Sequence, residues 1–320
     1  MSAEPRRPPL DLLTTGALAL AVVAVSSSAP LIAFAAAPAL AVAFWRNLIA
    51  VTALSPFVLV RRRAEFGRLI GGTGRREGMF CVLSGVALAA HFATWMPSAK
   101  LTSVAAAAAL VATQPVWQGL IARVQGRRLP LGVWAGVGVS VVGAMLATGA
   151  DFTVSGAAFA GDLLALAGGM FAAVYVALGE RARVTVSTAT YTTICYSVCG
   201  LILLVVCLVG RVPLGGFDTG TWLAVLALVA GAQLLGHSMF SYALRRIPAT
   251  TISVLILLEV PGAALIGWAW LGQLPAPATL PGLALVVAGV AVVVLSSART
   301  ARRASLPPAA VPAAPAPVPD

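Results

Sequence analysis

Two short stretches of the chain decide its fold: GVALAAH at residues 85–91 and GAQLLGH at residues 231–237. Both begin with glycine and end with histidine, and these are the only two histidines in the chain. A shift of 146 residues aligns the two stretches, including Leu88 with Leu234. Beyond them, the same shift pairs identical residues: Pro115 with Pro261, Gly126 with Gly272, Gly136 with Gly282 and Gly143 with Gly289. The sequence therefore predicts an internal repeat.

The composition around these stretches excludes an ordinary soluble enzyme. Of the 320 residues, 60% are hydrophobic and 10% are charged, whereas a soluble domain has about 45–50% apolar and about 25% charged residues. So little polar surface could not cover a soluble core, and the apolar fraction is too high for a disordered chain. The composition indicates an integral membrane protein.

Apolar runs of the length that a membrane helix needs, about 20 residues, divide nearly the whole chain. We predict ten of them, at 12–34, 39–60, 79–98, 101–122, 131–149, 157–178, 189–209, 219–243, 250–271 and 279–297. They form a first five-helix repeat at 12–149 and a second at 157–297, after an N-terminal tail at 1–11. The Pro- and Ala-rich segment 298–320 is expected to be a disordered tail.

The positive charges predict the orientation of these runs. The net charge is +11, and 18 of the 21 lysines and arginines lie in the terminal tails and alternate loops of one side. The other side holds Lys100 and Arg211, and Arg46 lies within a run. Positive charges gather on the cytoplasmic side, so both termini are expected there. The predominance of Ala, Val, Gly and Arg suggests a bacterial inner membrane. The same bias explains the basic balance without a nucleic-acid partner.

Five runs per repeat make the second repeat enter the membrane from the opposite side. Lys100 and Arg246 are equivalent in the alignment, yet they are expected on opposite faces. Inverted repeats are typical of secondary transporters, whose substrate site lies near the midplane between the halves. An all-α bundle of two inverted repeats therefore favours transport.

Several motifs, in order and spacing, support this view: FWRNLIA at 44–50, HFATW at 91–95, QPVW at 114–117, GDLLAL at 161–166, GHSMF at 236–240 and LEVP at 258–261. With them the chain resembles the EamA-type ten-helix members of the drug/metabolite transporter superfamily. The resemblance implies transport of a small organic solute and does not name it. Relatives usually end the fourth and ninth helices in Leu-Gly-Glu, whereas this chain has QGR at 125–127 and LGQ at 271–273.

Ionisable residues inside a membrane are costly, which makes each a candidate for function. Glu259 lies near the middle of the ninth run and could bind a proton or a substrate amine, or be satisfied by an arginine or free backbone. Arg46 could pair with Glu259, bind a substrate carboxylate, or extend outward to water. His91 and His237 could line the pathway and shuttle protons, or hydrogen-bond neighbouring helices.

Helix breaks and neutral polar residues complete the candidate site. Ser27, Ser28 and Pro30 interrupt the first run, where a broken helix could expose backbone to a substrate or simply kink. Pro115 and Pro261 are expected to break the fourth and ninth runs. The remaining candidates could contact the solute or serve in packing: Gln114, Gln233, Tyr196 and Trp95.

We therefore expect a secondary transporter that moves a metabolite, amino acid or drug-like compound by alternating access, with export preferred to import. No Gly-x-x-x-x-Gly-Lys-Ser/Thr loop is present, so an ion or solute gradient would drive it, and proton coupling is one hypothesis. The alternatives are a channel or facilitator, and an intramembrane enzyme, for which the sequence offers no catalytic or metal motif. No cofactor or metal is expected, and either a monomer or a homodimer fits.

Overall fold

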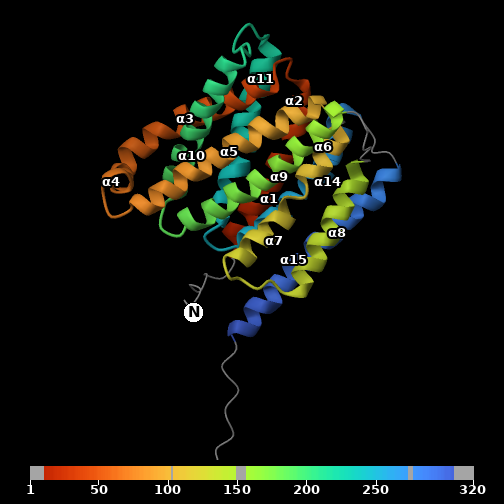
Figure 1. The fold of residues 1–320 in the computed structure, drawn as a ribbon. Helices are drawn as coiled ribbons and strands as arrows, with labels where there is room; N and C mark the ends of the chain where they lie inside the picture. Colours follow the sequence, from red (N-terminus) through yellow and green to blue (C-terminus); the bar gives the residue numbers. More distant parts are fainter. Residues whose placement is uncertain (1–10, 102–103, 149–155, 273–276, 306–320) are drawn as a thin grey trace, which may run out of the picture.

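The computed structural model describes residues 11–101, 104–148, 156–272 and 277–305, and within these ranges it consists of helices joined by loops, without strands. Figure 1 shows most of the long helices gathered in one bundle, with α8 and α15 along one side and α4 projecting from the other. This arrangement is that of an all-α integral membrane protein.

The described part of the first half contains eight helices. They are α1 (Leu12–Ser26), α2 (Ser28–Phe34), α3 (Ala39–Arg61), α4 (Arg63–Gly71), α5 (Arg75–Leu101), α6 (Val104–Val111), α7 (Gln114–Val124) and α8 (Leu131–Thr148). The first predicted run is thus two helices, α1 and α2, and the fourth is likewise two, α6 and α7. The sequence did not predict α4, a short helix between the second and third runs.

In the second half, the residues that the structure describes form nine helical segments. They are α9 (Gly156–Ala182), α10 (Thr188–Val209), α11 (Thr219–Leu228), the π-helix η1 (Val229–His237), α12 (Ser238–Ala243), α13 (Ala249–Ile256), α14 (Glu259–Leu271), the 3₁₀ turn η2 (Pro277–Thr279) and α15 (Leu280–Ser305). The eighth predicted run therefore changes from α-helix to π-helix and back, and the ninth is broken after Ile256.

Eight segments of the described chain are long and apolar enough to cross a membrane. They correspond to eight of the ten predicted runs. The other two are the α6–α7 pair, in which each helix is short, and α8, whose apolar part at Leu131–Ala147 falls just below the length required. A multi-pass membrane protein is established by these segments, and the count of ten spans stays a prediction.

The faces of α10 illustrate how these helices suit a bilayer. Cys195, Cys199 and Leu203, spaced four apart, are fully buried, whereas Leu201 and Leu208 on other faces are each 63% exposed. In water such exposed leucines would be costly, but lipid tails are as apolar as leucine. The exposed apolar side chains are therefore the lipid-facing surface.

The C-terminal helix is longer than the sequence predicted. α15 continues to Ser305, so the expectation of a disordered tail from residue 298 is wrong for residues 298–305; residues 306–320 lie outside the described part. Alanine and arginine favour helix, and they dominate residues 298–304, so the helix continues beyond the apolar run until it approaches the prolines at 307–308.

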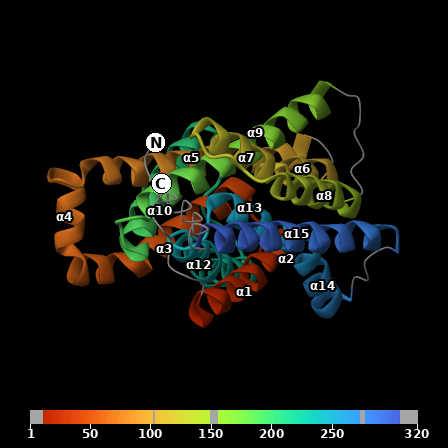
Figure 2. The same cartoon turned by 90° about the horizontal axis from the view of Figure 1, so that it is seen from below.

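The contact between α8 and α15 carries the symmetry expected of an inverted repeat. A Cβ atom added to Gly136 would lie 2.8 Å from the carbonyl oxygen of Gly289, and one added to Gly143 would lie 2.8 Å from that of Gly282. The repeat alignment exchanges these two contacts, since Gly136 corresponds to Gly282 and Gly143 to Gly289. The two helices, side by side in Figure 2, thus pack antiparallel at a separation that only glycine permits.

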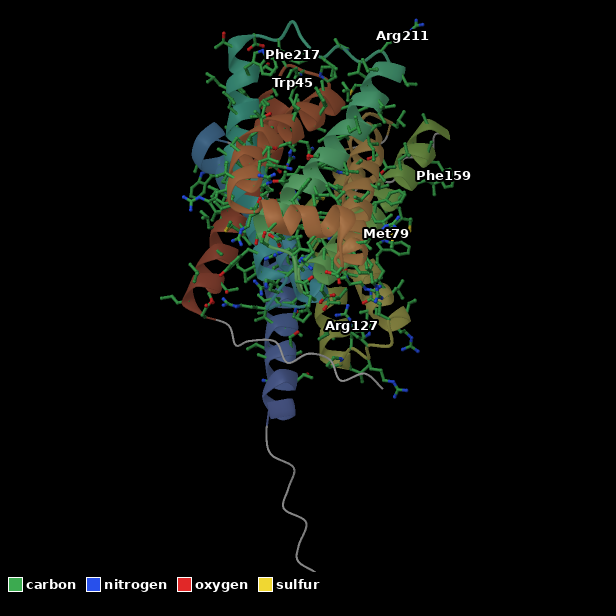
Figure 3. All side chains as sticks on the ribbon, turned by 90° about the vertical axis from the view of Figure 1, so that its left-hand side faces the viewer. Trp45, Met79, Arg127, Phe159, Arg211 and Phe217 are labelled. Carbon is green, nitrogen blue, oxygen red and sulfur yellow. The ribbon has the colours of Figure 1, made fainter. Side chains whose placement is uncertain are left out.

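The two ends of the bundle differ in chemistry. Figure 3 shows Arg127 near one end and Trp45, Arg211 and Phe217 near the other. The second end is aromatic: Trp45 packs 5.1 Å from Trp222 between ring centroids and donates its indole N–H to the carbonyl oxygen of Leu214 at 2.8 Å. Tryptophan is enriched where a membrane meets water, which suits this end.

Candidate functional site

Three helix breaks meet around one region of the bundle. Ser27 separates α1 from α2, residues 112–113 separate α6 from α7, and residues 257–258 separate α13 from α14. Pro115 is the second residue of α7 and Pro261 the third of α14, positions where the missing N–H costs no helical hydrogen bond. Pro30 lies within α2, one turn after its break. After the breaks at 112–113 and 257–258, new helices begin at Gln114 and Glu259, which are nearly equivalent positions in the two repeats.

A cavity of about 320 Å³ lies beside these breaks. Most of its wall is apolar, and seven of the ten predicted site residues line it: Ser28, Arg46, His91, Trp95, Gln114, His237 and Glu259. They come from both repeats. The other three candidates do not line the cavity: Ser27, whose hydroxyl donates to the carbonyl oxygen of Ala24, and Gln233 and Tyr196, which lie behind the wall.

Arg46 is the buried cation of this cavity. Its side chain on α3 is 2% exposed, so it does not extend outward to water as one prediction allowed. Its Nε donates to Oε1 of Gln233 at 2.8 Å, and its guanidinium carbon lies 5.1 Å from the centre of the Phe92 ring. The Nη2 atom is buried and has no hydrogen-bond partner among the described residues.

The π-helix η1 supplies the support for Arg46. Gln233, fully buried on η1, donates its Nε2 to Oδ1 of Asn47 at 3.2 Å while its Oε1 accepts from Arg46. In the wider turn of the π-helix, the backbone N–H of Ser238 donates to the carbonyl oxygen of Gln233. The Tyr196 hydroxyl also donates to this oxygen, at 3.4 Å. π-helical segments within α-helices occur frequently at functional sites, and here the π-helix η1 carries the amide that orients Arg46.

Glu259 lies on the same cavity as Arg46, but the two are not an ion pair. The Oε1 atom of Glu259 accepts a hydrogen bond from the Ser28 hydroxyl at 3.1 Å, which joins the broken helix α1–α2 to the broken helix α13–α14. No ion pair within 4.0 Å links it to Arg46 in the described part of the chain. The predicted Arg46–Glu259 contact is therefore absent from this conformation.

The two histidines, equivalent in the repeats, face the same cavity. The Nδ1 of His91 lies 2.9 Å from the carbonyl oxygen of Gly168, to which it donates a hydrogen bond because a carbonyl oxygen can only accept one. The ring stacks on Trp95 with centroids 5.8 Å apart and planes 5° apart. His237, the last residue of η1, packs edge-on against Tyr175 at 6.3 Å. A packing role and a role in proton movement both fit these contacts.

Gln114 has a partner in the opposite repeat. Its Nε2 donates to the buried hydroxyl of Ser253 on α13 at 3.3 Å. This contact ties the start of α7 to α13. The side chain still lines the cavity, so it combines a packing contact with a polar group on the wall.

Sequence reasoning missed Asn47, Phe92 and Ser238, which hold the Arg46 arrangement together. Asn47 follows Arg46 directly, and an amide inside an apolar run was a signal that could have been used. Phe92 carries no signal, because one phenylalanine in a membrane helix resembles any other. The π-turn itself depends on hydrogen-bond register, which hydropathy does not reveal.

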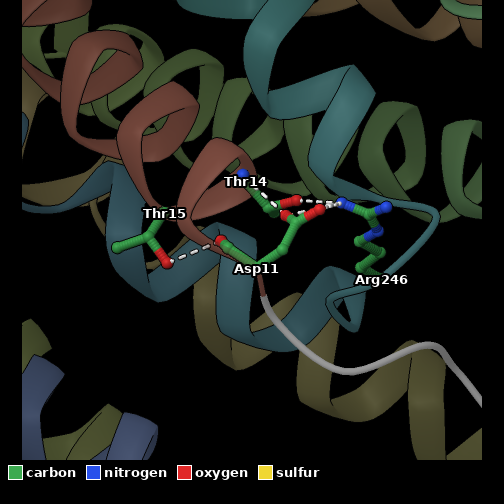
Figure 4. A network of polar contacts seen from close by, with 4 residues as sticks. All are labelled: Asp11, Thr14, Thr15 and Arg246. Carbon is green, nitrogen blue, oxygen red and sulfur yellow. Dashed lines mark hydrogen bonds and ion pairs between the residues drawn. The ribbon is translucent and has the colours of Figure 1, made fainter.

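Paired charges bridge helices at the end that holds Arg127. Arg127 donates to both carboxylate oxygens of Glu180 on α9, with Nη2 2.9 Å from Oε2, and Glu180 also accepts the N–H of Ala249 at the start of α13. Figure 4 shows the second pair, in which Arg246 donates to the Asp11 carboxylate at 2.7 Å and to Thr14. Each pair joins the first repeat to the second.

Known proteins share this architecture. The model of the EamA-like transporter family matches residues 13–149 and again residues 159–295, one match for each repeat. A protein with a solved crystal structure is similar in fold, with a TM-score of 0.74 and 21% identity over 92% of this chain and 99% of that chain. A search of the curated proteins gives no match. Since the family model covers most of the chain in two copies, the chain belongs to the EamA-like transporter family.

Proposed function

We propose that this protein is a secondary transporter that binds a small organic solute in the 320 Å³ cavity and moves it across the inner membrane by alternating access. The observation that carries the proposal is the origin of the cavity wall, to which both repeats contribute ionisable groups: Arg46 and His91 from the first, His237 and Glu259 from the second. A site between two inverted halves can open to either side when one half rocks against the other.

The proposal includes ten membrane-spanning helices and both termini in the cytoplasm. The α6–α7 pair counts as one broken span and α8 as another, in addition to the eight longer segments. Eighteen of 21 basic residues then lie on the cytoplasmic side, as positive charges do in bacterial inner membranes. The preferred direction is export, and the protein is not an enzyme.

The charge pairs at the Arg127 end act as the inner gate in this proposal. Alternating access requires contacts between the halves that form in one state and break in the other. The Arg127–Glu180 and Arg246–Asp11 pairs join the two repeats at that end, so their separation would open the cavity to the cytoplasm.

Glu259 is the coupling group of the proposal. It is an acid inside the membrane whose hydrogen bond to Ser28 joins two broken helices from opposite repeats. Protonation would remove its charge and weaken that contact, and so would shift the balance between the two states.

Flux in proteoliposomes tests the proposal. Uptake and efflux of a labelled panel of amino acids and other metabolites would be measured with and without an imposed pH gradient, for wild type and Glu259→Gln. We expect saturable flux that responds to the gradient and loses that response in the variant. Flux that never saturates would favour a channel instead, and flux indifferent to gradient and variant would remove Glu259 from the coupling role.

A further inference from the structure

The electrostatic position of Arg46 points to the chemistry of the solute. The side chain is 2% exposed, and a charged arginine at a membrane centre costs about 2.5–3.5 kcal/mol on the insertion scale. Such a charge is ordinarily paired with a carboxylate. Here the side chain donates one hydrogen bond, to the neutral amide of Gln233, and no carboxylate within the described residues forms an ion pair with it.

The surroundings hold the guanidinium in place for a partner that is not a protein side chain. Gln233 fixes the Nε side of the group and is itself held by Asn47. Phe92 lies against the guanidinium, with its ring centre 5.1 Å from the central carbon. The buried Nη2 has no hydrogen-bond partner among the described residues, and Arg46 lines the cavity. The planar fork therefore keeps unsatisfied N–H donors, and a carboxylate is the group whose geometry they match.

The rest of the cavity limits what is attached to that carboxylate. The apolar wall includes Leu88, Trp95, Val176 and Phe240, and the volume of about 320 Å³ suits a small molecule. Glu259, a carboxylic acid on the same wall, accepts a hydrogen bond from Ser28 at one of its oxygens and does not occupy the Arg46 fork. The site thus combines one preorganised anion-binding group with a mainly apolar chamber.

We infer that Arg46 binds the carboxylate of the transported solute, which is a small organic acid with an apolar body. The inference rests on the proposed function for its transport aspect, but the binding itself can be measured separately. Arg46 is a substrate-binding residue in this account, and Gln233 and Asn47 are positioning residues.

Equilibrium binding to the purified full chain in detergent micelles tests the inference, with empty micelles as the blank. Three probes share one body and differ in the head group: 3-phenylpropanoate, 3-phenylpropanamide and 3-phenylpropylamine. We expect wild type to bind the acid about 10- to 100-fold more tightly than the neutral amide, as charge-assisted hydrogen bonds would give. Arg46→Gln should abolish that preference, and Arg46→Lys should keep only part of it because lysine lacks the fork.

The exposed Arg123 on α7 provides the matched control. Arg123→Gln removes the same charge outside the cavity and should keep the preference for the acid. Folding of each variant is checked by a single size-exclusion peak and by its thermal unfolding midpoint, and Arg46→Lys serves if Arg46→Gln is not folded. Equal binding of acid and amide by wild type, or an unchanged preference in Arg46→Gln, would overturn the inference. This experiment measures binding and no flux. Failure of the inference about Arg46 can therefore be told apart from failure of the proposed transport function.

Discussion

The arginines at the centre of the bundle and at its Arg127 end have opposite kinds of partner. At the end, Arg127 and Arg246 each meet a carboxylate from the other repeat, at 2.9 and 2.7 Å. In the centre, Arg46 is more deeply buried, and among the described residues its one hydrogen-bond partner is the amide of Gln233. A paired charge stabilises a contact between helices, whereas an unpaired one is costly to keep. Under the proposal, this difference separates a residue that binds the solute from residues that hold the two halves together.

The largest expected effect is on function at the centre. Arg46→Leu should lower transport of organic acids about 10- to 100-fold, since the solute loses its charge-assisted hydrogen bonds. Stability should change little, because removing an unpaired buried charge offsets the lost contacts with Gln233 and Phe92. Initial uptake rates in proteoliposomes, with thermal unfolding of the same preparations, would check both. An Arg46→Leu protein that unfolds easily and still takes up organic acids would show that Arg46 serves stability and not binding, and would contradict the comparison of the two regions.

The second-largest expected effect is a loss of stability when the ion pair at the Arg127 end of the bundle is removed. Arg127→Leu should destabilise the protein by about 1–3 kcal/mol, because the Glu180 carboxylate, 8% exposed, loses both hydrogen bonds from Arg127. The double variant Arg127→Leu with Glu180→Leu should be less destabilised than the sum of the single variants. Denaturant or thermal unfolding of all four proteins completes the cycle, and strictly additive effects would show that the pair is not coupled.

The smallest effect concerns Asp11, at the exposed start of α1. Hydrogen bonds from the Thr14 hydroxyl and backbone N–H, with Arg246 nearby, hold the pKa of Asp11 below its usual value of 3.8. A lowered folded-state pKa means that the stabilisation is present above the usual value and is lost as pH falls through the folded value. Wild type should therefore lose a little more thermal stability than Asp11→Asn between pH 5 and about pH 2. Parallel melting curves for the two proteins would contradict this.

Hydropathy predicted most of the fold because a bilayer demands long apolar helices. It also predicted much of the candidate site, since a charge such as Arg46 or Glu259 is conspicuous inside an apolar run. It could not predict which partners those charges would meet. The contact of Glu259 with Ser28 instead of Arg46 depends on how the broken helices α1–α2 and α13–α14 cross. The π-turn that positions Gln233 depends on hydrogen-bond register, and composition carries no record of it.

Access to the cavity from the two sides of the membrane tests the central claim, that a site between the halves opens alternately. Ala263, a cavity-lining residue of α14, would be changed to cysteine after the four native cysteines, all buried, are replaced by alanine. A membrane-impermeant thiol reagent would then be applied to inside-out and right-side-out vesicles. Alternating access predicts labelling from both sides, and Arg127→Leu should speed labelling from the cytoplasmic side while slowing it from the other. Labelling from one side only, or a rise on both sides together, would contradict the account.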